Sequence, residues 1–320
     1  MTISVVDLFC GCGGYSLGFI QAGCKILLAV DIDPYTLKTY NQNNSGIPIL
    51  NTDIRNLHSQ QILEKIKIKP DIIIASPPCE SYTNANRYRK KDPFMRLYDD
   101  PMGRLVLHAI RLISDLEPKA FIIENVPQVA DGVLKECLIR EFERVGISQV
   151  YFNRFRTEDY GTPSKRARLF ISNVKIRMKK QSRVKDLKLM DMIGDLPPPN
   201  SIHDFKNHEL TQISKKRNKK IQRLRRGSSL IYYRSARNKM NTNWKKLQGN
   251  QVCPTIIGHS RYVHPTEKRL LTVREHARLM GYPDDYEFAG GTSNQYNQIG
   301  ESVPVPLSNA IAKFCLNNLF

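Results

Sequence analysis

The chain contains 320 residues, of which 41% are hydrophobic, which is enough for one large domain or for a large and a small domain built around a real core. Its formal net charge of +19 indicates a polyanionic partner, with nucleic acid as the first candidate. No apolar run approaches the ~18 residues that a membrane span needs, so we expect no membrane partner.

Cysteine usage bears on the compartment. The seven cysteines are odd in number, and strand-like residues follow Met1 where a signal peptide would stand. Both features favour a reducing, cytoplasmic protein. Cys10, Cys12 and Cys24 are close in sequence, but no Cys-x-x-Cys pair or histidine at ligand spacing accompanies them, so we expect no metal.

The N-terminal segment predicts a ligand site. Ile3–Phe9 is typical of a strand, Cys10–Gly14 of a glycine-rich turn, and Tyr15–Ala22 of a helix. This order places backbone N–H groups and a helix N-terminus beside a ligand. Ser16 occupies the last glycine position of G-x-G-x-x-G, which argues against a nicotinamide or flavin cofactor.

Two carboxylates follow the next predicted strands. Lys25–Val30 ends at Asp31, 18 residues after Gly13 and close to the ~20 at which a strand-end carboxylate takes ribose hydroxyls. After a helix around 35–43, a short apolar segment leads to Asp53. These positions favour a nucleoside ligand other than NAD, although either carboxylate could simply cap the following helix.

A cysteine follows the most apolar of the predicted strands. Asp71–Ala75 is closed by Ser76-Pro-Pro-Cys-Glu80, because proline cannot continue a strand ladder. Cys79 is therefore expected at the C-terminal end of a strand, where ligands bind in open α/β sheets, although an inert buried cysteine is the alternative. The charged stretch Ser81–Asp100 is longer than a loop that only joins two elements, and it is typical of a lid or a disordered loop.

The α/β alternation continues to about residue 174. An amphipathic helix at Gly103–Leu116 feeds the strand Ala120–Ile123, which again ends in a carboxylate, Glu124. A helix at 131–145 and strands at 149–155 and 167–174 follow. Arg166 and Arg168 stand two residues apart, so in a strand they would point the same way and could grip one object. A solvated sheet edge is the alternative.

The basic charge is concentrated in one stretch. Residues 173–268 hold 23 Lys and Arg against 6 Asp and Glu, a net +17, densest in Lys215–Arg226. Aromatic and amide side chains are interleaved with these cations and can touch base edges as well as phosphates. This stretch predicts a second, smaller domain that binds nucleic acid. Thr272 and Glu275 then form a capping box before a helix, and a last helix runs to Leu319.

Taken together, these stretches resemble the DNA (cytosine-5)-methyltransferases, in order and over nearly the whole chain. The segments that carry the resemblance are Asp7–Gly14, Asp31–Tyr35, Asp53, Pro77–Cys79, Glu124–Val126, Arg166–Arg168, Leu271–Pro283 and Gln298–Pro304. The resemblance implies a Rossmann-like S-adenosylmethionine-dependent methyltransferase fold. It also implies a catalytic, cofactor-binding domain at 1–175, a basic target-recognition domain at 176–268, and a segment at 269–320 that returns to the catalytic domain.

The resemblance also implies roles for single residues. Cys79 is the nucleophile, Glu124 holds and protonates N3 of the cytosine, and Arg166 and Arg168 anchor that site. S-adenosylmethionine is held by Phe9, Gly11, Gly13, Asp31, Asp53, Pro78 and Ser302, with Asp31 on the ribose and Asp53 on the adenine amino group. We expect a desolvated pocket to favour the protonated form of Glu124. A target atom inside the base stack requires base flipping, with Ser81–Asp100 as the lid.

The expected enzyme is a monomer that methylates C5 of a specific cytosine in double-stranded DNA, associated with a prokaryotic nucleoid and serving as the modification enzyme of a restriction-modification system. Two alternatives stay open: a tRNA cytosine-5 methyltransferase of the same fold, and a catalytically inactive DNA-binding member. Three positions depart from the family pattern. Glu80 and Ser164 stand where the family usually has Gln, and Glu301 stands where it usually has Asn.

Overall fold

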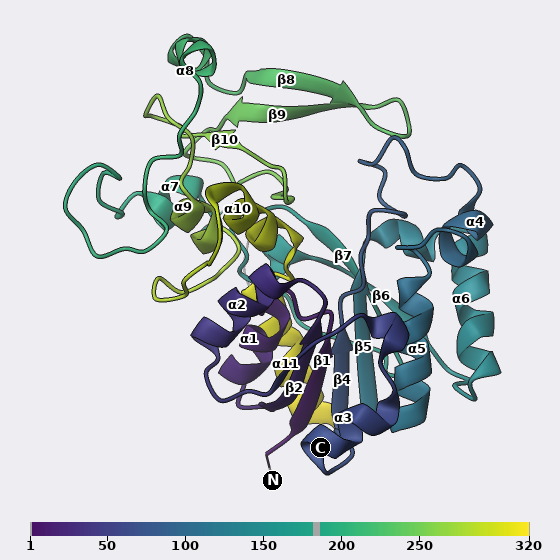
Figure 1. Cartoon of the computed structure of the whole chain (residues 1–320). Coiled ribbons are helices and arrows are strands. Elements are labelled where there is room, and N and C mark those ends of the chain that lie inside the picture. Colours follow the sequence, from purple (N-terminus) through teal and green to yellow (C-terminus); the bar gives the residue numbers. More distant parts are fainter. Residues whose placement is uncertain (1, 182–185, 320) are drawn as a thin grey trace.

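The computed structural model describes residues 2–181 and 186–319. Its largest element is a seven-stranded sheet in the order β3-β2-β1-β4-β5-β7-β6 (Figure 1). The strands are β1 (Ser4–Leu8), β2 (Lys25–Asp31), β3 (Ile49–Asn51), β4 (Ile72–Ala75), β5 (Ala120–Asn125), β6 (Tyr151–Arg156) and β7 (Ala167–Ser172). The first five are parallel, whereas β7 runs antiparallel to both β5 and β6. The predicted α/β class is confirmed.

Alternation along the central strands produces two apolar faces. In β4, Ile73 and Ala75 face one layer while Ile72 and Ile74 face the other. Helices α3 (Ser59–Ile66), α5 (Leu105–Leu116) and α6 (Val133–Arg144) cover the first face, and α1 (Gly14–Gln21) and α11 (Val305–Leu319) cover the second. Because both faces are covered, the central strands are continuous apolar runs.

The chain returns to the large sheet at its C-terminal end. Helix α11 packs closely on α1, where Ser308 Oγ donates a hydrogen bond to the Tyr15 carbonyl oxygen at 2.6 Å. A Cβ on Gly18 would lie 2.4 Å from Ser308, so only glycine allows this approach. The predicted capping box is present at the start of α9 (Val273–Arg278), and α10 (Thr292–Glu301) follows it.

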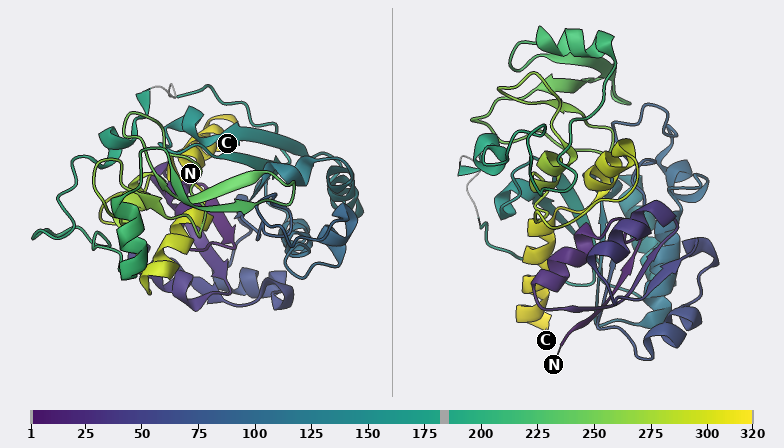
Figure 2. Two further views of the ribbon diagram at one scale, coloured as in Figure 1. Left: turned by 90° about the horizontal axis from the view of Figure 1, so that it is seen from above. Right: turned by 60° about the vertical axis from the view of Figure 1, so that its left-hand side comes forward.

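A smaller, three-stranded sheet lies within the basic stretch. It contains β8 (Ser229–Arg234), β9 (Met240–Lys246) and β10 (Tyr262–Val263), with α8 (Lys215–Gln222) beside it and α7 (Leu189–Ile193) earlier in the chain. Its small core joins Ile221, Trp244, Val263 and Leu270. Figure 2 shows this sheet beyond one end of the large sheet. Arg183 and Lys185 of the basic stretch lie outside the described residues, and the domain division at 176–268 stays a prediction.

The charged stretch after Cys79 is partly helical. Helix α4 (Pro93–Tyr98) begins where the Asp92 side chain accepts a hydrogen bond from the Phe94 N–H, with Pro93 in the first turn. Asp-Pro is a helix-start signal, so this helix was readable in the sequence although we did not predict it. Short 3₁₀ turns, η1 (Ile54–Asn56), η2 (Pro127–Ala130) and η3 (Thr157–Tyr160), complete the large domain.

Candidate active site

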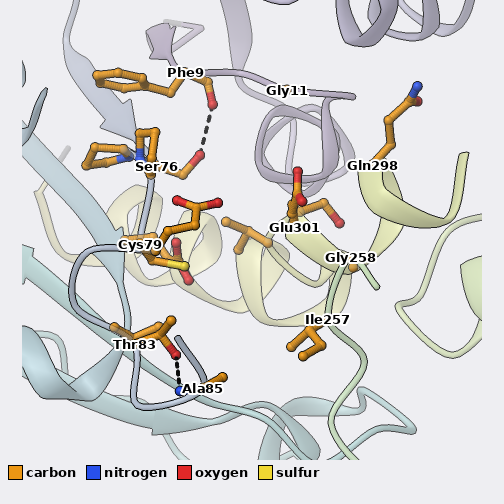
Figure 3. A pocket seen from close by; sticks show the side chains of 18 of the residues that line it. Phe9, Gly11, Ser76, Cys79, Thr83, Ala85, Ile257, Gly258, Gln298 and Glu301 are labelled. Atoms are coloured by element: carbon orange, nitrogen blue, oxygen red, sulfur yellow. Dashed lines mark hydrogen bonds between the residues drawn. The ribbon is translucent and has the colours of Figure 1, made fainter. Parts of the chain in front are cut away.

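A cavity of about 1120 Å³ lies where the parallel strands of the large sheet end, and the β8–β9 hairpin forms its opposite wall. Ten of the eleven predicted site residues line it: Phe9, Gly11, Asp31, Asp53, Pro78, Cys79, Glu124, Arg166, Arg168 and Ser302. Figure 3 shows Phe9, Gly11, Cys79 and Glu301 around this cavity. The topology of the sheet therefore gathers side chains from both ends of the chain.

The glycine-rich turn is held by a strand-end carboxylate. Gly11 has φ of 52° and donates its backbone N–H to Asp31 Oδ2 at 2.8 Å. The other oxygen of Asp31 accepts from the Asp33 N–H at 2.9 Å. A Cβ on Gly11 would meet no atom within 4 Å, so the turn leaves open space on the cavity side. Burial raises the pKa of Asp31.

Gly13 serves packing at this turn. It is the predicted cofactor residue that does not line the cavity. Its φ is 95°, and a Cβ would lie 2.6 Å from the hydroxyl of Tyr286. Gly13 is also the N-cap of α1. The sequence pattern could not separate a glycine that faces the ligand from one that faces the core.

Asp53 is consistent with both interpretations of its position, a helix cap and a residue of the ligand site. Its carboxylate accepts a hydrogen bond from the Arg55 N–H and pairs with the Arg55 side chain, which lowers its pKa. It therefore caps η1, as the alternative interpretation stated, and it also lines the cavity. Asp31, in contrast, does not cap α2 (Pro34–Asn43), because the N-cap of that helix is Asp33.

Hydrogen bonds fix the turn that carries Cys79. The Asn125 side-chain amide donates to the Pro77 carbonyl oxygen at 3.1 Å, and the Tyr82 and Thr83 N–H groups donate to the Cys79 carbonyl oxygen at 3.0 and 2.9 Å. Burial raises the pKa of the Cys79 thiol to about 11, while Arg168 acts in the opposite direction. In the free protein, Cys79 is a thiol held at a fixed place. Sequence reasoning missed Asn125 as a support, although it lies next to Glu124.

Of the two arginines, Arg168 contacts Glu124, whereas Arg166 contacts the backbone. Arg168 Nε lies 2.6 Å from Glu124 Oε1, and both side chains are largely buried. Arg166 instead donates to the carbonyl oxygens of Gly300 at 2.8 Å and Ile256 at 3.3 Å. The two arginines therefore have different protein partners although both line the cavity, and their joint hold on one ligand stays a prediction. Arg166 directly precedes β7, and its carbonyl oxygen accepts a hydrogen bond from the Thr157 N–H at 2.8 Å.

The pairing of Glu124 also modifies an expectation. Its carboxyl group is buried, as expected, but a guanidinium stands against one of its oxygens. Glu124 therefore has a cation as well as a desolvated pocket around it, and its protonated form stays a prediction. Glu124 also lines the cavity, so its carboxyl group can be reached by a ligand there.

The basic stretch meets the cavity through the hairpin. Tyr233, Asn241, Asn243 and Lys245 line it, whereas α8, the densest basic element, does not. The hairpin tip also touches the loop after Cys79, because the Ala236 N–H donates to the Asn84 carbonyl oxygen at 2.9 Å. Nearby, Arg237 pairs with Asp131 at 3.7 Å. The hairpin tip thus contacts the large domain at two neighbouring places.

Two features are absent from the part of the chain that the structure describes. Within residues 2–181 and 186–319, no group of three or more His, Cys, Asp or Glu side chains could hold a metal ion. Within the same residues, no helix is long and apolar enough to cross a membrane.

A mixed sheet of this order, with a glycine turn after β1 and a carboxylate at the end of β2, defines a Rossmann-like S-adenosylmethionine-dependent methyltransferase fold. Residues 3–317 match the model of the C-5 cytosine-specific DNA methylases. The chain therefore belongs to this family and is a DNA (cytosine-5-)-methyltransferase, as the sequence predicted.

Two relatives support the assignment, and one solved structure shares the fold. A provisionally designated type II methyltransferase of Methanocaldococcus jannaschii is 45% identical over 97% of this chain and 98% of its own. The type II methyltransferase M1.HphI of Haemophilus parahaemolyticus is 30% identical over 99% and 87%. In fold, the chain is similar to a crystal structure of a prophage-encoded E. coli protein described as a DNA modification methyltransferase, with a TM-score of 0.77, 24% identity and 99% of each chain covered.

Proposed function

We propose that this chain transfers a methyl group from S-adenosylmethionine to C5 of a specific cytosine in duplex DNA, as the modification enzyme of a restriction-modification system. The observation that carries the proposal is the convergence of Cys79, Glu124 and Arg168 in one cavity with the Gly11–Asp31 turn. A thiol, a carboxyl group and a nucleoside cradle are the parts that this transfer needs.

The cavity fits the cofactor. It has about 1120 Å³ for a nucleoside and a base together, and the open space beside Gly11 would be filled by any larger side chain. When bound, S-adenosylmethionine supplies an electrophilic methyl group on a sulfonium. Asp31 and the glycine turn would hold its ribose, and Phe9, Asp53, Pro78 and Ser302 would complete the site. Gly13 would act through the shape of the turn.

The cytosine site follows from the same residues. C5 of cytosine is a weak nucleophile, so the Cys79 thiolate adds to C6 while Glu124 delivers a proton to N3, and the electron-rich C5 then accepts the methyl group. A base such as water then takes the C5 proton, the C6–S bond breaks to release the Cys79 thiolate, and N3 returns its proton to Glu124, which restores the ring. Arg168 orients Glu124 through their 2.6 Å contact. Arg166 positions the wall of the site through Gly300.

The state of Cys79 sets a requirement. With its pKa raised to about 11, the thiol carries its proton at neutral pH. We therefore expect the thiolate to form only when the cytosine is bound, in the same step as its attack on C6. The nearby Arg168 and Arg166 charges favour the thiolate, and exclusion of water by the bound base would strengthen their effect.

DNA would enter between the large sheet and the hairpin. The target base lies inside the stack, so the nucleotide must swing out to reach Cys79. The hairpin side chains Tyr233, Asn241 and Asn243 supply groups that can touch the duplex. The contact between Ala236 and Asn84 makes the loop after Cys79 and the hairpin one unit that would close on bound DNA.

The mechanism is tested by trapping its covalent step. A duplex with fluorine at C5 of the target cytosine accepts the methyl group but has no C5 proton to lose. With S-adenosylmethionine it should leave protein and DNA joined through a denaturing gel, and mass spectrometry should place the link on Cys79. The target itself is read first, by bisulfite sequencing of DNA from cells that express the chain.

Matched variants make the trap specific. Cys79→Ser should abolish the adduct, because a serine hydroxyl offers almost no alkoxide at neutral pH without an adjacent base. Cys24→Ser should leave the adduct intact, because Cys24 stands just before the start of β2, whereas the cavity lies at the other end of that strand. Methylation of ordinary cytosine by Cys79→Ser, or an adduct at another cysteine, would overturn the mechanism. If the enzyme methylates bulk tRNA but not duplex DNA, its substrate is RNA and the proposed DNA substrate is wrong.

A further inference from the structure

Two acidic side chains line the cavity at positions where the family pattern has amides. Glu80 follows Cys79, and Glu301 precedes Ser302, far away in the sequence. The structure brings both to the same cavity, and the negative charge of Glu80 acts on Glu301. Two independent departures from the pattern thus lie in one cavity and add negative charge to it.

Glu301 is built into this wall. It is the last residue of α10, and a Cβ on Gly258 would lie 2.5 Å from its Oε1, so the glycine makes room for the carboxyl group. Figure 3 shows Glu301 beside Gly258, across the cavity from Cys79. Glu301 is exposed toward the cavity, and the close approach of Gly258 limits the hydration of its carboxyl group on that side.

The groups that act on Glu301 come from several elements. Glu80 follows β4, Asp31 and Asp33 stand at the end of β2, and Arg166 precedes β7. Burial and the nearby Glu80 raise the pKa of Glu301 to about 7, while Arg166 opposes them. Cys12 also faces this carboxyl group, but burial raises the pKa of its thiol to about 12, so it stays neutral. The cofactor side of the cavity is therefore predominantly acidic.

Methyl transfer changes the charge of the cofactor. The sulfonium donor carries one positive charge more than the thioether that remains after its methyl group has left. We propose that Glu80 and Glu301 make this site select the cationic cofactor over its neutral, demethylated product. The inference rests on the proposed function, because it assumes that S-adenosylmethionine binds in this cavity.

Electrostatics gives the size of the effect. A carboxylate about 10 Å from a unit positive charge, with an effective dielectric constant between about 20 and 80, changes the affinity for that charge by about two- to seventeenfold. An amide at the same place has no such effect. The product would leave more readily than from a site with amides. The same charge has a disadvantage for catalysis, because Glu80 also raises the pKa of Cys79 and so disfavours its thiolate.

Isothermal titration tests this selection. Affinities for S-adenosylmethionine and S-adenosylhomocysteine are measured at pH 8 for the wild type, Glu80→Gln, Glu301→Gln and the double variant. The ratio of the two affinities should fall by about two- to seventeenfold for each substitution. Glu143→Gln, an exposed carboxylate on α6 outside the cavity, is the matched control and should keep the wild-type ratio.

The pH dependence is a second signature. Lowering the pH from 8 to 6 protonates Glu301, so the wild-type ratio should fall toward that of Glu301→Gln, and the variant should change much less. Glu80 is exposed, so an unchanged ratio in Glu80→Gln would overturn the proposal even if Glu301→Gln fails to fold. A wild type that binds neither compound would instead overturn the proposed function.

Discussion

Arg168 Nε and Glu124 Oε1 lie 2.6 Å apart, and the two side chains are only 9% and 8% exposed. The pair depends on the direction of one strand. Because β7 runs antiparallel to β5, the start of β7 lies beside the end of β5, where the cavity is. A parallel β7 would have placed Arg168 at the opposite edge of the sheet.

Breaking this pair should be costly. Arg168→Ala leaves a buried carboxylate without its cation, so we expect a loss of about 3–5 kcal/mol in the free energy of unfolding, together with a strong loss of activity. Adding Glu124→Gln should recover part of the stability but none of the activity. Denaturant unfolding measures the first and methyl incorporation the second.

The matched control is Arg154→Ala on β6. Arg154 pairs with Asp131 at 3.0 Å, but both side chains are about half exposed, so its removal should cost at most about 1 kcal/mol. Equal losses in the two variants would mean that the Arg168–Glu124 pair is no more than a surface contact in energetic terms.

Local patterns were sufficient for part of this structure. The strand, glycine turn and helix at the N-terminus, the ends of β4 and β5 at Cys79 and Glu124, and the Thr272 capping box all follow from spacing and from proline and glycine chemistry. These features depend on neighbours in the sequence. A strand that ends in two prolines presents its next residue at the edge of the sheet wherever that strand lies.

Other features depend on contacts between distant segments. An apolar run does not encode its direction or its partner, so the insertion of β7 between β5 and β6 was not predictable from the residues. The same holds for the separation of Arg166 from Arg168 and for the meeting of Glu80 with Glu301. Gly13 illustrates the limit within one motif, because its neighbour Tyr286 comes from the C-terminal segment.

Asp31 provides a test of the cofactor site. Its carboxylate holds the glycine turn and is expected to take ribose hydroxyls, so Asp31→Ala should weaken S-adenosylmethionine binding by ~1–3 kcal/mol, the range for removal of a polar partner. Isothermal titration measures this change. Asp115→Asn, an exposed carboxylate on α5, should bind the cofactor as the wild type does. Unchanged affinity in Asp31→Ala would remove this residue from the cofactor site.

The basic helix α8 provides a test of the DNA footprint. The affinity for DNA should fall steeply with salt, because cations that contact phosphates release counterions. Replacing Lys215, Lys216, Lys219 and Lys220 with Gln should flatten the plot of log affinity against log salt, by up to ~0.9 for each phosphate that the helix no longer neutralises. Arg217 is left in place because its guanidinium lies 4.9 Å from the Trp244 ring and supports the small core.

Lys65 and Lys67 form the control for this series. They lie at the end of α3, away from the cavity and from α8, so their replacement with Gln should leave the salt slope unchanged. If the α8 variant also keeps the wild-type slope, α8 is a solvated face, and the DNA is held by the hairpin alone.

Asp7 should make stability depend on pH. It is fully buried below the glycine turn, its Oδ2 accepts a 2.6 Å hydrogen bond from Ser16, and its Oδ1 has no partner. Burial raises the pKa of Asp7 to about 8, although the Ser16 hydrogen bond acts in the opposite direction. In the unfolded chain, the pKa of an aspartate is about 3.9. The folded state therefore holds this proton more tightly.

The sign of the effect follows from this difference. Between about pH 4 and pH 8 the unfolded chain has released the proton and the folded chain has kept it, so raising the pH favours unfolding by up to ~1.4 kcal/mol per pH unit. Asp7→Asn carries no such proton. The unfolding free energy of the wild type relative to Asp7→Asn should therefore fall steadily from pH 5 to pH 8, as measured by denaturant titration. A difference that stays constant over this range would mean that Asp7 is already ionised in the folded protein, held by Ser16 and by water at Oδ1.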